Sequence, residues 1–162
     1  SVRCVVLTHT GGTFCAGADL SEATEGGTDD PARERAVLEE YGYLHGWERF
    51  WGRDTGPMTG IFVDQFERRA GADAYAEDLA VNKAELYGVD LGEDPPDLPP
   101  SCRDLTVAEP VPEAGLTSPA AFAWCWHGVF SVGVTAVGPT VDEALAEVVS
   151  VMGRQLAMLP PA

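Results

Sequence analysis

The stretch AFAWCWHGVFSVGVTAV, residues 121–137, decides the fold. Two runs rich in β-branched and aromatic residues, 121–126 and 129–137, are separated only by His127 and Gly128. Such residues favour strands, and a two-residue connection that contains glycine is typical of a tight hairpin. The sequence therefore predicts an antiparallel β-hairpin with its turn at His127 and Gly128.

Counting outward from that turn assigns each side chain of the hairpin to one face. Trp126 is expected opposite Val129, and Cys125 opposite Phe130, with successive pairs on alternate faces. One face then carries mainly small aliphatic side chains. The other face carries three large aromatic side chains, Phe122, Trp124 and Trp126.

A helix is predicted directly after the hairpin. Thr140 is a suitable N-cap, and Glu143 stands where a capping box places its second partner. The apolar stripe of this helix is expected to cover the aliphatic face of the hairpin. Its members recur at helical spacing: Val141, Leu145, Val148, Met152, Leu156 and Leu159.

The preceding part of the chain repeats the order of strands followed by a helix. Alternating aromatic and apolar residues over 43–53 and 58–67 predict two strands joined by a turn around 54–57. A one-faced helix is predicted over 70–87, where Gly88 supplies a left-handed C-cap. A shorter helix is predicted before these strands, from Pro31 at its first position to Tyr41, with Gly42 ending it.

These elements predict an α+β domain over residues 26–162, built in two halves of about 30–88 and 101–160. The run DLGEDPPDLPPS at 90–101 is too rich in proline for a helix or a central strand, so it is expected to be the loop between them. The architecture is expected to be a two-layer sandwich of antiparallel strands with helices on one side. A separate strand-turn segment, residues 1–25, precedes it.

Composition excludes several classes of partner. The formal net charge is −16, with only ten basic residues, so the chain would repel nucleic acid and anionic lipid surfaces. No run approaches the roughly 20 apolar residues of a membrane span, and no targeting signal is visible. The chain starts at Ser1, as expected of a processed protein or a fragment. Nine of the ten basic residues are arginine, a composition that indicates an actinobacterial type of source.

Four cysteines show no spacing typical of a zinc or redox site. With residues 1–25 set aside, Cys102 and Cys125 remain, as in a disulfide-stapled extracytoplasmic domain. Two buried free thiols are the alternative. We expect no metal and no cofactor.

The best candidates for recognition in the larger domain are Phe122, Trp124 and Trp126, with Trp47 and Trp51 as further aromatic residues. Tryptophan opposite small residues leaves an open platform. This platform either packs against the first half of the domain or binds a small apolar or peptide ligand.

Polar candidates are weaker. Asp64 lies in a strand between Phe62 and Phe66, where burial would raise its pKa, although an aspartate that is hydrogen-bonded or faces solvent is the simpler expectation. None of the three histidines, His9, His45 and His127, has a nucleophile or acid at a suggestive spacing. Four acidic residues, Asp90, Glu93, Asp94 and Asp97, do not match a calcium loop and are expected to be a solvated acidic segment.

The N-terminal run VRCVVLTHTGGTFCAGADLSE, residues 2–22, resembles the oxyanion-hole segment of the enoyl-CoA hydratase (crotonase) family. The resemblance implies that the backbone N–H of Ala18 would help to bind a thioester enolate, with Gly17 shaping the turn. It also implies acyl-CoA as a substrate. The later Gly-Gly-Gly segment and the catalytic glutamates of that family have no counterpart in residues 23–162. Three explanations stay open: an enzyme fragment followed by unrelated sequence, a junction near residues 23–30, and a chance match.

Residues 40–162 loosely resemble actinobacterial extracytoplasmic lipoprotein or sensor-type domains, in the segments IFVDQF, AGADAYAEDLA and QLAMLPP. The leading hypothesis is therefore a non-catalytic extracytoplasmic binding or sensor-type module. The alternative is a partial enoyl-CoA hydratase/isomerase, which would be cytoplasmic and would bind acyl-CoA near Gly17 and Ala18. The oligomeric state is open under both hypotheses.

Overall fold

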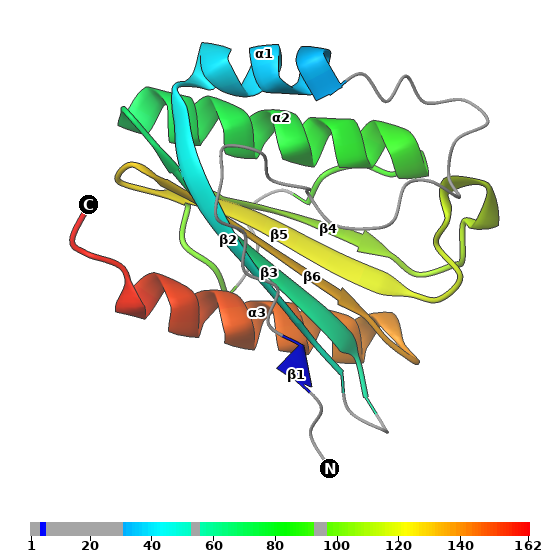
Figure 1. The fold of residues 1–162 in the computed structure, drawn as a ribbon. Helices are drawn as coiled ribbons and strands as arrows, with labels where there is room; N and C mark the ends of the chain where they lie inside the picture. Colours follow the sequence, from blue (N-terminus) through cyan, green and yellow to red (C-terminus); the bar gives the residue numbers. More distant parts are fainter. Residues whose placement is uncertain (1–3, 6–30, 53–55, 93–96) are drawn as a thin grey trace.

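The computed structural model describes residues 4–5, 31–52, 56–92 and 97–162. They form one antiparallel sheet in the order β1-β2-β3-β6-β5-β4, flanked by three helices (Figure 1). The strands are β1 (Cys4–Val5), β2 (Tyr43–Trp51), β3 (Met58–Phe66), β4 (Cys102–Val107), β5 (Ala120–His127) and β6 (Phe130–Val137). The helices are α1 (Pro31–Tyr41), α2 (Arg69–Tyr87) and α3 (Val141–Met158), and a short 3-10 helix, η2 (Pro112–Ala114), precedes β5.

The predicted hairpin is present as β5 and β6, but its turn lies one residue further along. His127 belongs to β5 and pairs with Phe130, so the two loop residues are Gly128 and Val129. Gly128 has φ of 59°, a conformation that glycine adopts without steric cost, and this fixes it at the first loop position. Each residue of β5 therefore faces a partner two positions beyond the expected one. The division of side chains between the two faces is unchanged.

Both faces of the hairpin are buried, each under a different helix (Figure 1). Helix α3 covers the aliphatic face, as predicted, and packs Ala144, Val148 and Met152 on the alanines and valines of β5 and β6. Helix α2 covers the aromatic face through Ala76 and Ala80. The α+β class and the antiparallel sheet are confirmed, whereas the placement of the helices on one side is wrong. The aromatic face is as apolar as the aliphatic one, so it also requires a covering layer.

Strand β4 was not predicted from the sequence. Its six residues, CRDLTV, mix apolar with charged and polar side chains without strict alternation, and it pairs along its length with β5 at one edge of the sheet. The two halves of the domain meet through β3 of the first and β6 of the second, which pair from Met58 to Gln65. Both halves therefore contribute to one continuous sheet.

Local sequence signals set most helix ends. Helix α1 ends at Gly42, with φ of 72°, and α2 ends at Gly88, with φ of 65°, as predicted. The Thr140 hydroxyl accepts a hydrogen bond of 3.2 Å from the backbone N–H of Glu143 and caps α3. Within the described residues no helix is both long and apolar enough to cross a bilayer.

Helices α1 and α2 touch where α2 begins, and a glycine permits the contact. A Cβ atom placed on Gly71 would lie 1.9 Å from the carbonyl oxygen of Tyr41, a backbone atom that cannot rotate away. Gly153 in α3 offers the opposite situation, because a Cβ there would meet nothing within 4 Å. The two glycines form a matched pair for testing the fold.

We expect Gly71→Ala to lower the free energy of unfolding by about 2 kcal/mol or more, because the methyl group would force α1 and α2 apart. Gly153→Ala should raise it by about 0.5–1 kcal/mol, since alanine restricts the unfolded chain and favours an exposed helical position. Urea unfolding followed by circular dichroism measures both. Equal effects of the two substitutions would contradict the α1–α2 contact.

Candidate functional site

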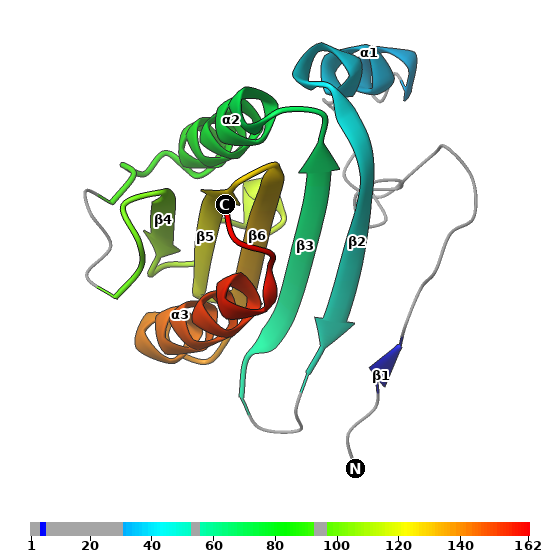
Figure 2. The same ribbon diagram turned by 90° about the vertical axis from the view of Figure 1, so that its left-hand side faces the viewer.

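Strands β2 and β3 extend beyond the helices that cover the rest of the sheet. Helices α2 and α3 pack mainly on β5 and β6, and Figure 2 shows β2 on the side of the sheet away from both. Several large apolar side chains of these two strands are exposed, among them Leu44, Trp47, Phe50 and Met58. They are divided between the two faces of the sheet: Trp47 lies on the face that α3 covers and Phe50 on the face that α2 covers.

A groove of about 370 Å³ lies on the α3 face, between this exposed region and the C-terminal end of α3. We call it the α3-side groove. Strands β2, β3 and β6 form its floor, and α3 with the residue after it forms one wall. Its lining is mainly apolar: Trp47, Ile61, Val63, Phe130 and Leu159, with Glu48, Arg49 and Gln155 as polar members.

Trp47 is the largest exposed side chain of the groove, with 53% of its surface accessible. Its ring lies edge-on against His45, with ring centroids 4.6 Å apart, so a neighbour on the same strand supports it. Further along β2, the guanidinium of Arg49 lies 5.9 Å from the ring centroid of Trp51. The groove therefore offers an aromatic surface held by its neighbours, next to aliphatic side chains from β3.

The predicted aromatic platform is mostly covered. Phe122 and Trp124 are only 3% and 6% exposed, because they pack beneath α2. Their rings stack with centroids 5.8 Å apart. The sequence left open whether these residues pack against the first half of the domain or bind a ligand. In the structure Phe122 and Trp124 pack against α2 of the first half. Trp126 is half-buried near the hairpin end, where the guanidinium of Arg103 lies 5.4 Å from its ring centroid.

Trp47 and Trp51 lie on the opposite face from this platform. Trp47 pairs with Val63 of β3, and Val63 pairs with Val132, whose side chain belongs to the core under α3. Trp51 packs against that same core. The aromatic residues that the sequence grouped together are thus divided between two faces, and only Trp47 is well exposed in the groove.

Asp64 is buried on the α2 face. Among the described residues, no basic side chain forms an ion pair with its carboxylate. Its carboxylate occupies the space beside Gly46, where a Cβ atom would come within 2.1 Å of Oδ1. Ser131, its partner on β6, has a buried hydroxyl without a hydrogen-bond partner. Burial, and then the carboxylate of Glu48, raise the pKa of Asp64 from 3.8 to about 7. Burial and Asp64 in turn raise the pKa of Tyr43 to about 12.

The remaining polar candidates do not assemble into a site among the described residues. His127 lies 2.8 Å from the carbonyl oxygen of Pro160, so its ring fastens the chain after α3 to the hairpin. No three acidic, histidine or cysteine side chains in the described ranges gather as a metal site would require. Asp90 and Asp97 are exposed, while His9, Gly17, Ala18, Glu93 and Asp94 lie outside the described residues.

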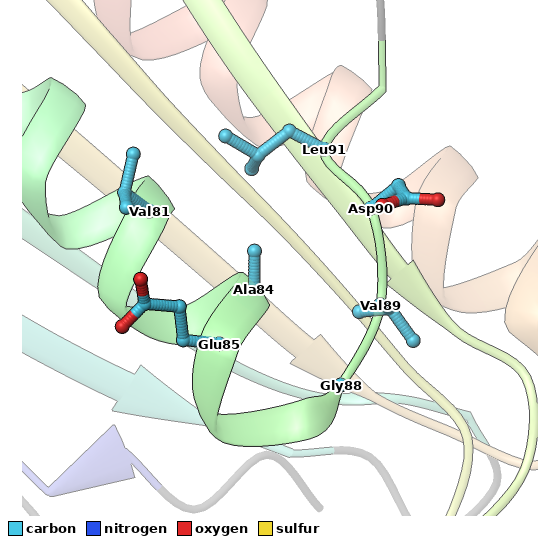
Figure 3. A pocket seen from close by; sticks show the side chains of 7 residues that line it. All are labelled: Val81, Ala84, Glu85, Gly88, Val89, Asp90 and Leu91. Carbon is cyan, nitrogen blue, oxygen red and sulfur yellow. The ribbon is translucent and has the colours of Figure 1, made fainter.

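A second hollow of about 370 Å³ lies where α2 ends and the chain turns toward β4 (Figure 3). Val81 and Ala84 line it from the helix, and Val89 and Leu91 line it from the following segment. Figure 3 shows the carboxylates of Glu85 and Asp90 on opposite sides of this hollow, pointing away from each other. They form no pair that could hold a ligand between them.

The cysteines at 102 and 125 are joined. Cys102 and Cys125 pair directly across β4 and β5 and form a disulfide, buried at 1% and 0% exposure. Of the two alternatives left open by the sequence, the structure contains the disulfide.

Sequence reasoning missed most of the groove. Ile61, Val63, Phe130 and Leu159 were interpreted only as core or strand residues. The available signal was in β2, whose residues Trp47, Phe50 and Trp51 place aromatic side chains on both faces. A strand with aromatic side chains on both faces needs a covering layer on each face. Helices α2 and α3 lie mainly over β5 and β6, so part of β2 stays exposed.

Comparison with known proteins gives a fold and no family. No family model and no curated protein matches the chain. Its fold is similar to that of the extracellular domain of PknH from Mycobacterium tuberculosis, with a TM-score of 0.55 and 13% sequence identity. The likeness covers 76% of this chain and 70% of that one.

The raised pKa of Asp64 predicts a specific pH dependence of stability. Because the folded state favours the protonated carboxyl, this contribution is fully present below about pH 4 and is lost as the pH rises through about 7. We expect Asp64→Asn to raise the free energy of unfolding at pH 8 by about 2–4 kcal/mol. The substitution should also flatten the dependence between pH 4 and 7.

Chemical unfolding at pH 4, 6 and 8 measures this effect. Glu113→Gln changes an exposed carboxylate before β5 and is the matched control, which should alter stability by less than about 0.5 kcal/mol. An Asp64→Asn protein with the same pH profile as the parent would show that the carboxyl is ionised and solvated in the folded state.

Proposed function

We propose that this chain is a non-catalytic binding or sensor-type module that works outside the cytoplasm and binds an apolar ligand in the α3-side groove. The observation that carries the proposal is the groove itself, where exposed Trp47 lies beside Ile61, Val63 and Leu159. Ligand sites are typically concave and mainly apolar, with a few polar groups that orient the ligand. Arg49 and Gln155 are such groups here, whereas the carboxylate of Glu48 lies on the opposite face, beside Asp64.

Two observations support an extracytoplasmic location. The Cys102–Cys125 disulfide is of a kind that persists in oxidising compartments and is rare in the cytosol. The solved structure with a similar fold is an extracellular domain. We propose the same type of location for residues 26–162 of this chain.

The charge of the chain restricts the ligand. A net charge of −16 repels anionic molecules, and the lining of the groove is mainly apolar. We therefore propose a neutral apolar molecule or an apolar peptide segment as the ligand. The volume of about 370 Å³ suits a small molecule or one to three side chains of a peptide.

The alternative of a partial enoyl-CoA hydratase has less support. The residues it needs, Gly17 and Ala18, lie outside the described part of the chain, and no family model matches the sequence. The second oxyanion donor and the catalytic glutamates of that pattern are absent from the sequence. Turnover of a short 2-enoyl-CoA by the purified chain would overturn the non-catalytic proposal.

Binding in the groove can be tested with a neutral apolar dye, N-phenyl-1-naphthylamine. We expect its fluorescence to rise on binding and Trp47→Ala to weaken the affinity by about tenfold, because the largest exposed apolar surface of the groove is removed. Met158→Ala, on the exposed side of α3, is the matched control and should leave the affinity unchanged. Equal affinities of the parent and Trp47→Ala would contradict the groove as the site.

The disulfide can be tested independently of any ligand. Peptide mapping without reduction should recover the segments around Cys102 and Cys125 as one linked species. Reduction should lower the free energy of unfolding by about 2–4 kcal/mol, because it releases a loop with a sequence separation of 23 residues. Recovery of both cysteines as free thiols in protein exported to an oxidising compartment would count against the proposed location.

A further inference from the structure

The α3-side groove is elongated and has two chemically different ends. The register of the sheet fixes their order, because Arg49 of β2 pairs with Ile61 of β3, whereas Phe130 of β6 pairs with Gln65 of β3. Four residues of β3 separate these two levels, a distance of about 13 Å at the usual rise of a strand. Both Arg49 and Phe130 line the groove, so it has a basic end and an aromatic end.

Helix α3 runs along the groove from the basic end toward the aromatic end. In the first half of the helix, Glu147 Oε1 accepts a hydrogen bond of 3.5 Å from the hydroxyl of Thr59, which lies near the start of β3. The chain after α3 is fastened to the tip of the β5–β6 hairpin by the ring of His127. Gln155 precedes Leu159 by four residues, about one helical turn, so it lies nearer to the basic end than Leu159 does.

The two polar side chains that face the groove, Arg49 and Gln155, can both donate hydrogen bonds. A guanidinium has five N–H donors and no acceptor, and the amide of glutamine has two N–H donors. The ring of Trp51, with its centroid 5.9 Å from the guanidinium, restricts the orientations that Arg49 can take. Donors near one end of an apolar groove favour a ligand that has an oxygen acceptor at one end and hydrocarbon along the rest.

The charges near the basic end favour a neutral acceptor over a carboxylate. Glu147 contacts Thr59, which precedes Ile61, the partner of Arg49, by two residues, or roughly 7 Å along β3. A carboxylate bound at Arg49 would be repelled by this acidic side chain, and the net charge of −16 would oppose its approach. The carbonyl oxygen of an ester or amide accepts the same hydrogen bonds without carrying a charge.

We infer that the α3-side groove binds linear acyl esters or amides lengthwise, with the carbonyl oxygen at Arg49 and Gln155. The acyl chain lies along the apolar lining and ends near Phe130 and Leu159. Burial of the hydrocarbon provides the binding energy, and the donors set the direction of the chain. This inference rests on the proposed function, because it specifies the ligand class of the same groove.

Calorimetric titration with methyl octanoate tests the inference, and N-phenyl-1-naphthylamine is the reference ligand without a carbonyl group. Arg49→Met removes the donors and retains an unbranched apolar side chain. We expect this substitution to weaken the binding of the ester about tenfold more than the binding of the dye, because hydrogen bonds from a charged donor are lost. Arg154→Met makes the same change of charge at an exposed position of α3 outside the groove lining, so it should leave both affinities unchanged.

Octanoate, which is ionised at pH 8, is the second probe. It should bind the parent protein more weakly than methyl octanoate, and Glu147→Gln should narrow the difference. Equal losses of ester and dye affinity in Arg49→Met would overturn the inference and leave the proposed function standing. Binding of octanoate as tight as that of the ester would have the same effect. A parent protein that binds neither the dye nor the ester would overturn both.

Discussion

The central constraint on this fold is that β5 and β6 are apolar on both faces. A strand pair of that kind cannot remain at a surface, so each face requires a covering layer, and the chain supplies α2 for one and α3 for the other. The alanines of α2 fit this arrangement, since small side chains let the helix lie close over the rings of Phe122 and Trp124. Both helices are thereby committed to the middle of the sheet.

Because both helices lie over the middle of the sheet, the end of the sheet formed by β2 is left partly uncovered. With α2 and α3 centred on β5 and β6, β2 lies largely outside their cover, and Trp47 and Phe50 are exposed at 53% and 37%. The groove forms where the covered and uncovered regions meet, beside the C-terminal end of α3. The aromatic residues of the chain thus divide into a structural set under α2 and an accessible set on β2. Both sets contain the same residue types, and they differ only in whether a helix covers them.

Features set by local chemistry could be predicted from the sequence. The Gly42 and Gly88 helix ends, the Thr140 cap and the β5–β6 hairpin depend on neighbouring residues, and each was predicted. Features set by distant parts of the chain could not. Strand β4 depends on the edge that β5 offers, the side taken by α2 depends on which face α3 leaves open, and the groove requires three strands and a helix. Asp64 shows the boundary: its aromatic neighbours made burial one option, but the simpler expectation of a satisfied or solvent-facing carboxylate did not foresee burial beside Glu48 and Ser131, which became visible only in the sheet.

The disulfide between β4 and β5 has a topological consequence for the sheet. Strand β4 is an edge strand, and edge strands can detach, exchange with another molecule, or serve as templates for further strands. The bond joins Cys102, the first residue of β4, to Cys125 inside the buried hairpin, so this edge is anchored covalently to the best-protected part of the molecule. Opening of β4 is thereby limited to its far end near Val107. In an environment without chaperones or a supply of reductant, such an edge guards against strand exchange as long as the bond survives.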